Sequence, residues 1–130
     1  MTINEYLQQR KEQFNKDLIE SEGRKQQLIN EKPYEWESQF RSAENMIDDR
    51  KESLTTIDYL FEIAKKTNDE IVRILKKEIR TNNGLMKLTQ LEYDYTNREL
   101  YRIQKAEYRK YFFNNVLYKD VLKIIKEQKN

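Results

Sequence analysis

Apolar residues recur at helical spacing in three segments of the chain, with polar residues between them. The first segment runs from about Ile3 to about Glu31 and repeats weakly, because Lys11, Ser21 and Lys25 occupy positions where a heptad core residue is expected. We therefore predict a helix over about 3–31 that is the least stable of the three. Pro33 ends it, since a proline restricts the residue before it and is tolerated at the start of the next helix.

The second segment has the most regular pattern in the chain. From Trp36 to Leu75, apolar residues follow alternating steps of four and three, and only Arg50 and Asn68 interrupt them. A heptad seam of this length predicts a long helix over about 33–80. A polar residue on such a seam either fixes the register of the partner helix or marks a place where the seam is open, and the sequence leaves both readings standing.

The segment Thr81-Asn82-Asn83-Gly84 predicts a turn, because Asn and Gly tolerate the left-handed backbone that closes a helix. A third helix is expected over about 85–126. Folding at this turn aligns the two long helices almost end to end. The predicted fold is all-α: a long antiparallel, coiled-coil-like hairpin with a shorter N-terminal helix packed on it, in one domain spanning residues 1–130.

The charge distribution supports pairing of the two long helices, and the amino-acid composition excludes several classes of catalytic and metal-binding site. The chain carries 25 Lys+Arg and 23 Asp+Glu; acidic residues prevail over 33–80 and basic residues over 81–130, which favours antiparallel pairing of the two long helices. It has no Cys, no His and two Gly. It therefore lacks thiolate and imidazole ligands, the commonest general base and a Gly-rich phosphate loop. We expect a non-enzyme with no catalytic residues, metal or cofactor.

The apolar runs are far shorter than the roughly 20 residues of a membrane-spanning helix, and the N-terminus has no signal-peptide pattern. We expect no membrane span and a cytoplasmic protein.

Tyrosines are concentrated in the third segment. Tyrosine is enriched at protein interfaces, and a two-helix pair cannot bury every apolar face of this segment. We expect another helical protein, or a second copy of the chain in a homodimer, to cover the remainder. The residues predicted to form this protein interface are Trp36, Phe61, Leu100, Tyr101, Tyr108, Tyr111 and Tyr118.

Basic residues form a predicted stripe on the third segment, at Arg98, Arg102, Lys105 and Arg109. Such a stripe can follow phosphates or an anionic surface, and it can also be a solvated outer face. A net charge of +2 is small for a dedicated nucleic-acid binder, so nucleic acid is not the expected partner. The alternative function is that of a phage- or mobile-element-type regulatory protein that binds nucleic acid or another protein through this basic face.

Four short stretches resemble a known class of helical proteins: Phe40-Arg41-Ser42-Ala43-Glu44, Leu60-Phe61-Glu62-Ile63-Ala64, Leu91-Glu92-Tyr93-Asp94-Tyr95 and Glu99-Leu100-Tyr101. With their helical context, they make residues 36–125 similar to the small targeting factors, or chaperones, of LXG toxins in Gram-positive type VII secretion systems. The resemblance implies binding to the helical N-terminal domain of such a toxin, together with a second small helical partner. The chain lacks a Trp-x-Gly turn, so the resemblance implies export with a partner, or release before export.

Overall fold

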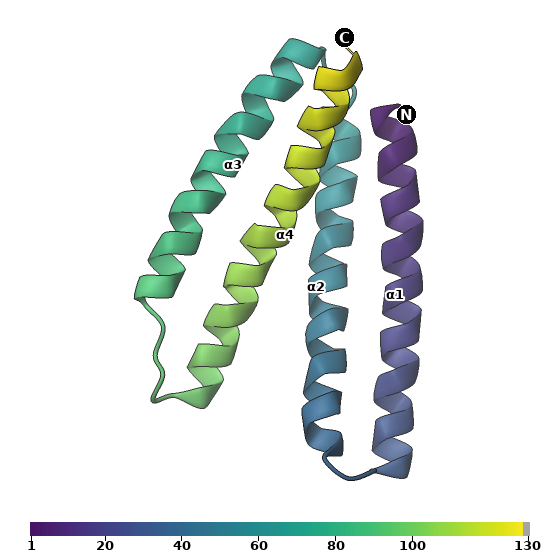
Figure 1. The fold of residues 1–130 in the computed structure, drawn as a ribbon, viewed down its shortest axis with the longest axis vertical. Helices are drawn as coiled ribbons and strands as arrows, with labels where there is room; N and C mark the ends of the chain where they lie inside the picture. The colour runs from purple at the N-terminus through teal and green to yellow at the C-terminus, as the bar shows by residue number, and fades with distance from the viewer. Residues whose placement is uncertain (129–130) are drawn as a thin grey trace.

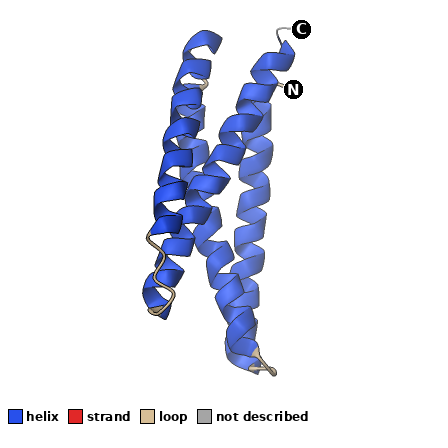
Figure 2. Ribbon diagram, turned by 60° about the vertical axis from the view of Figure 1, so that its left-hand side comes forward, coloured by secondary structure: helices blue, strands red, loops and turns tan. Residues whose placement is uncertain are grey.

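The computed structural model describes residues 1–128, and within them the chain forms four α-helices and no strand (Figures 1 and 2). The all-α prediction is confirmed. The helices are α1 (Ile3–Glu31), α2 (Trp36–Ile63), α3 (Asn68–Leu91) and α4 (Arg98–Gln128). The first helix has its predicted bounds, whereas the two long helices predicted over 33–80 and 85–126 are replaced by three.

The predicted second helix is divided at residues 64–67, a correction to the sequence analysis. Thr67 caps α3: its hydroxyl accepts a hydrogen bond from the Glu70 backbone at 3.3 Å, and the Glu70 carboxylate accepts one from the Thr67 backbone at 3.2 Å. This reciprocal capping box satisfies two backbone N–H groups that a helix start leaves without partners. The apolar seam predicted for one long helix is therefore shared between two helices, α2 and α3.

The predicted turn at residues 81–84 is also wrong, because these residues lie inside α3. Asn82 is buried there and donates a hydrogen bond to Asn115 of α4 at 3.0 Å. The actual turn lies at residues 92–97. The Asp94 carboxylate accepts hydrogen bonds from Thr96 and Asn97, and the Asn97 side chain caps α4 by accepting from the Leu100 backbone at 3.1 Å.

The four helices form two antiparallel hairpins, α1–α2 and α3–α4, which meet through α2 and α4. The cross-contacts Arg109–Asp49, Lys110–Glu52 and Asn114–Thr56 advance in the same direction along both chains, so α2 and α4 run parallel. Helix α2 comes from the acidic segment and α4 from the basic segment, so the two segments do pair here, but in parallel and not antiparallel as the predicted hairpin requires. The two hairpins converge where the chain ends lie and diverge toward the α1–α2 and α3–α4 turns, as Figure 1 shows.

The main core lies at the end where the hairpins converge, which we call the closed end. Its buried side chains come from all four helices and include Leu7, Phe14, Ile57, Leu60, Ile63, Ile71, Leu75, Leu117, Tyr118, Val121 and Ile125. Toward the opposite, open end, α1 and α2 bury a few further residues between themselves: Leu28, Ala43 and Ile47. The shared core therefore covers only part of the length of the molecule.

A layer of buried polar side chains lies on α4 at Asn114 and Asn115, between the shared core and the open end. Asn114 accepts a hydrogen bond from Thr56 of α2 at 2.6 Å. Asn115 accepts one from Asn82 of α3 at 3.0 Å and donates one to Asn83 at 3.1 Å. Because buried polar groups are costly without partners, this polar layer fixes the register of α4 against both neighbours.

Candidate protein-binding cleft

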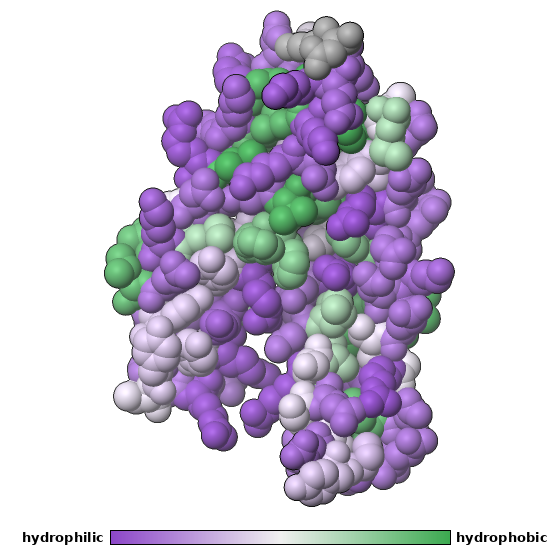
Figure 3. All heavy atoms as spheres, viewed as in Figure 1, coloured by the Kyte–Doolittle hydropathy of each residue, from purple (hydrophilic) through white to green (hydrophobic). Residues whose placement is uncertain are grey.

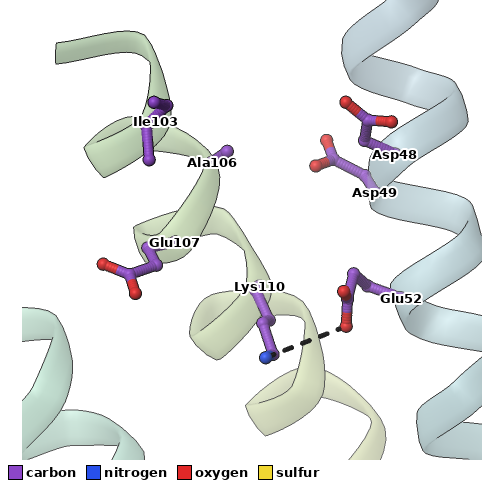
Figure 4. Close-up of a pocket in the computed structure, with 7 residues that line it drawn as sticks. All are labelled: Asp48, Asp49, Glu52, Ile103, Ala106, Glu107 and Lys110. Atoms are coloured by element: carbon purple, nitrogen blue, oxygen red, sulfur yellow. Dashed lines mark ion pairs between the residues drawn. The ribbon is translucent and has the colours of Figure 1, made fainter. Parts of the chain in front are cut away.

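Beyond the polar layer, α2 and α4 separate and leave a cleft between the two hairpins. Figure 3 shows the molecule notched at this end, with mainly hydrophilic surface around the notch. The inner part of the cleft has a volume of about 280 Å³. Seven residues line it, three from α2 and four from α4: Asp48, Asp49, Glu52, Ile103, Ala106, Glu107 and Lys110 (Figure 4).

Carboxylates dominate the α2 wall of the inner cleft. Asp48, Asp49 and Glu52 lie on the side of α2 that faces α4, whereas Glu107 points away from α2 (Figure 4). The Arg109 guanidinium contacts Asp49 at 3.1 Å, and Lys110 lies 3.9 Å from Glu52. Burial raises the pKa of Asp49, and Arg109 opposes that rise only in part.

The floor of the inner cleft is apolar. It is formed by Ile103 and Ala106 of α4, and the Ile103 side chain is 54% exposed. Leu100, one turn earlier on α4, is 39% exposed. An exposed apolar strip flanked by charges is typical of a surface that a partner covers.

The outer part of the cleft, which we call the mouth, has the opposite charge. Three arginines and one glutamate line it: Arg41 from α2, and Arg98, Glu99 and Arg102 from α4. Glu99 pairs with Arg102 at 3.1 Å. Within residues 1–128, Arg41 and Arg98 form no ion pair, so the mouth keeps an excess of positive charge.

The structure separates the residues of the predicted protein interface. Leu100 is exposed beside the cleft. Tyr101 packs edge-on against Tyr93, with ring centroids 5.3 Å apart, in a cluster at the α3–α4 turn. Tyr108 and Tyr111 are partly buried and share the face of α4 that carries Asn115, which contacts α3. They therefore belong mainly to the interior of the α3–α4 hairpin.

The other three residues of that prediction lie outside the cleft. Tyr118 is only 5% exposed and belongs to the core, so it presents no surface to a partner. Trp36 begins α2 at the α1–α2 turn and packs edge-on against Phe40 at 5.9 Å. Phe61 is partly buried at the closed end, where it borders a shallow hollow along α1.

The predicted basic stripe is not continuous in space. Arg98 and Arg102 lie at the mouth, whereas Arg109 is turned into the cleft and neutralised by Asp49. Lys105 lies over the Tyr101 ring, with its Nζ 5.7 Å from the ring centroid. The stripe is thus divided among three environments.

Sequence reasoning missed the α2 wall of the cleft and gave no site role to Ile103. Ile103 lies within the predicted third helix and Asp48 within the predicted second, and nothing in their spacing marks either residue as part of a site. The sequence signal that could have placed these two residues in one cleft is the capping box at Thr67 and Glu70. A helix break at this position lets α2 and α4 run parallel, which brings Asp48 and Ile103 to the same end of the molecule.

Among residues 1–128, no group of three or more acidic residues is arranged to hold a metal ion. None of the helices described is long and apolar enough to cross a membrane. Comparison of the chain with protein-family models, curated proteins and solved structures finds no match.

Proposed function

We propose that this protein is a non-catalytic binding partner for another helical protein, and that the cleft between α2 and α4 receives an amphipathic helix of that partner. The observation that carries the proposal is the exposed apolar floor of Ile103 and Ala106 on α4, which lines the cleft opposite the carboxylates of α2. Amphipathic helices bind such grooves by placing an apolar ridge on the floor and charged residues against the walls.

The arrangement of the core supports a binding role for the open end. The shared core and the polar layer hold the hairpins together at one end without using the side chains of the cleft. A partner can therefore cover Ile103 while the fold remains intact. Covering apolar surface is the main favourable term in most protein association.

The more specific form of the proposal is a chaperone or targeting factor for an LXG toxin of a type VII secretion system. It rests on the resemblance of residues 36–125 to that class of small helical proteins. In this form, the helix received by the cleft belongs to the helical N-terminal domain of the toxin, and the complex forms in the cytoplasm before export.

The test is binding of the purified chain to the N-terminal domain of an LXG toxin from the same organism. Ile103→Glu should weaken binding by about tenfold or more, because it places a charge on the apolar floor. Ile19→Glu is the matched control: Ile19 is also exposed, at 71%, but lies on α1 away from the cleft. An equal loss of affinity in both variants would contradict the role of the cleft. If the unmodified chain does not bind the toxin domain, the proposal of a type VII chaperone or targeting factor is wrong.

A second candidate function is nucleic-acid binding at the α3–α4 turn. The specific observation is the cluster of Tyr93, Tyr95 and Tyr101 beside Lys105, in which Tyr95 is 76% exposed. Exposed rings beside cations can stack on unpaired bases. Binding of this kind should fall steeply as salt rises from 50 to 200 mM, whereas helix binding in the cleft should change far less.

A further inference from the structure

The two parts of the cleft differ in the sign of their charge, which bears on what they can hold. The inner part is lined by four carboxylates and Lys110, and the nearby Arg109 still leaves it acidic. The mouth is lined by three guanidinium groups and Glu99. The α2 wall changes from basic at Arg41 to acidic at Asp48, Asp49 and Glu52, whereas the α4 wall changes from arginines at the mouth to the apolar side chains of Ile103 and Ala106.

The existing ion pairs do not remove this contrast. Asp49 and Glu52 are paired with Arg109 and Lys110, but Asp48 forms no ion pair within residues 1–128. At the mouth, Glu99 pairs with Arg102, and the other two arginines, Arg41 and Arg98, form no ion pair with any described residue. Each end of the cleft therefore keeps charges that a ligand can complement.

We propose that the cleft selects its helix by charge order: the bound helix places basic residues against the acidic inner part and acidic residues at the mouth, with apolar residues on Ile103 between them. This inference rests on the proposed function. Arg41 and Asp48 are seven residues apart on one helix, so the change of sign occurs over about 10 Å, or two helical turns. The ligand is thus a partner helix with segregated charges.

The opposite placement of the same helix is disfavoured at both ends. Its basic residues would face Arg41 and Arg98, and its acidic residues would face Asp48. Like charges brought together in an interface suppress a wrong arrangement more effectively than matching charges strengthen the right one. The cleft therefore fixes which way the helix lies as well as whether it binds.

The test uses two synthetic amphipathic helices of identical composition and identical leucine ridge. One has glutamates in one half and lysines in the other, and the second has the two charges alternating. At low salt, fluorescence anisotropy should show that the segregated peptide binds about five- to tenfold tighter, as expected from a few exposed ion pairs. The double variant Arg41→Glu/Asp48→Lys should abolish this preference, whereas the matched control Glu20→Lys/Arg73→Glu on α1 and α3 should preserve it.

Orientation gives a second readout. A nitroxide on the lysine half should broaden the amide resonances of residues 48–52 and 106–110, and a nitroxide on the glutamate half should broaden those of Arg41 and Arg98. Equal affinity of the two peptides, with Ile103 resonances shifted, would overturn the charge-order inference and leave the proposed function intact. Failure of both peptides to shift Ile103 would overturn the inference too, and the toxin-domain experiment would then decide the proposed function separately.

Discussion

Arg50 illustrates how single residues join the hairpins. Its Nε lies 3.1 Å from Asp17 of α1, and its guanidinium lies 5.0 Å from the ring centroid of Phe14 and 5.6 Å from that of Phe113. An arginine on an apolar seam is thus accommodated by one carboxylate and two aromatic faces. Asn68, the other polar residue on the predicted seam, is exposed at the start of α3.

Replacing Asn115 by alanine should destabilise the protein by about 2 kcal/mol, because Asn82 would lose its acceptor and a small cavity would form. Denaturant unfolding followed by circular dichroism measures this change. Asn15→Ala, on the exposed surface of α1, is the control and should stay within about 0.5 kcal/mol. Equal stability of the two variants would show that the polar layer does not hold α4 in place.

Buried tyrosines make stability sensitive to alkaline pH. Burial raises the pKa values of Tyr6 and Tyr118 above the ordinary value of 10.0, and a hydrogen bond to Asp120 adds to the effect at Tyr6. Above pH 10 the unfolded chain loses these protons and the folded chain keeps them, so the free energy of unfolding should fall as pH rises. Tyr118→Phe should flatten that fall between pH 9 and 11. An unchanged slope would contradict the assignment of Tyr118 to the core.

At the scale of helices, the sequence contains two visible signals for a chain break, and the structure uses only one of them. The pattern Thr67-x-x-Glu70 is a helix-start signature that is visible in the sequence, so the α2–α3 break was within reach of prediction. The Asn-Asn-Gly stretch is an equally visible turn signal, yet Asn82 is used to reach Asn115 and the stretch is helical. The angle between the hairpins, which creates the cleft, depends on the packing of all four helices and has no local signature.

Gly84→Ala distinguishes a helix from a turn at this position. A Cβ added to Gly84 meets nothing within 4 Å, and the residue lies inside α3. The substitution should therefore stabilise the protein by about 0.5–1 kcal/mol, because glycine loses more backbone freedom than alanine in a helix. Thermal unfolding monitors the change. A loss of stability would favour the turn that the sequence suggested.

Thr67→Ala removes one half of the capping box and should cost about 1 kcal/mol. Thr81→Ala is the matched control within the same helix; Thr81 is exposed, so its replacement should be neutral or slightly stabilising. Both variants can be compared by urea unfolding. Similar effects at the two positions would indicate that the hydrogen bonds of Thr67 do not determine where α3 begins.

At the scale of the whole molecule, stability is distributed unevenly. The shared core lies at the closed end, and the open end of the α1–α2 hairpin has only a few buried side chains, such as Leu28 and Ala43. Regions with few buried contacts open locally before the whole protein unfolds. The open end is therefore both the least supported part of the fold and the part that carries the cleft.

Hydrogen exchange tests this gradient. Amides of residues 54–63 and 117–125 should be the most protected, and those of residues 20–45 should exchange at least about tenfold faster. A peptide bound in the cleft should slow exchange around residues 41–52 more than at the closed end. Uniform protection along α1 and α2 would contradict the division into a closed and an open end.

The polar layer also has a mechanical consequence. About 24 Å of helix extends from Asn114 to Arg98, so a small change in the tilt of α4 at this layer would be magnified at the mouth. A tilt of about 10° at the asparagines would move the mouth by about 4 Å. A substitution that tilts α4 at the two asparagines would therefore change the width of the mouth far more than the packing around the asparagines themselves.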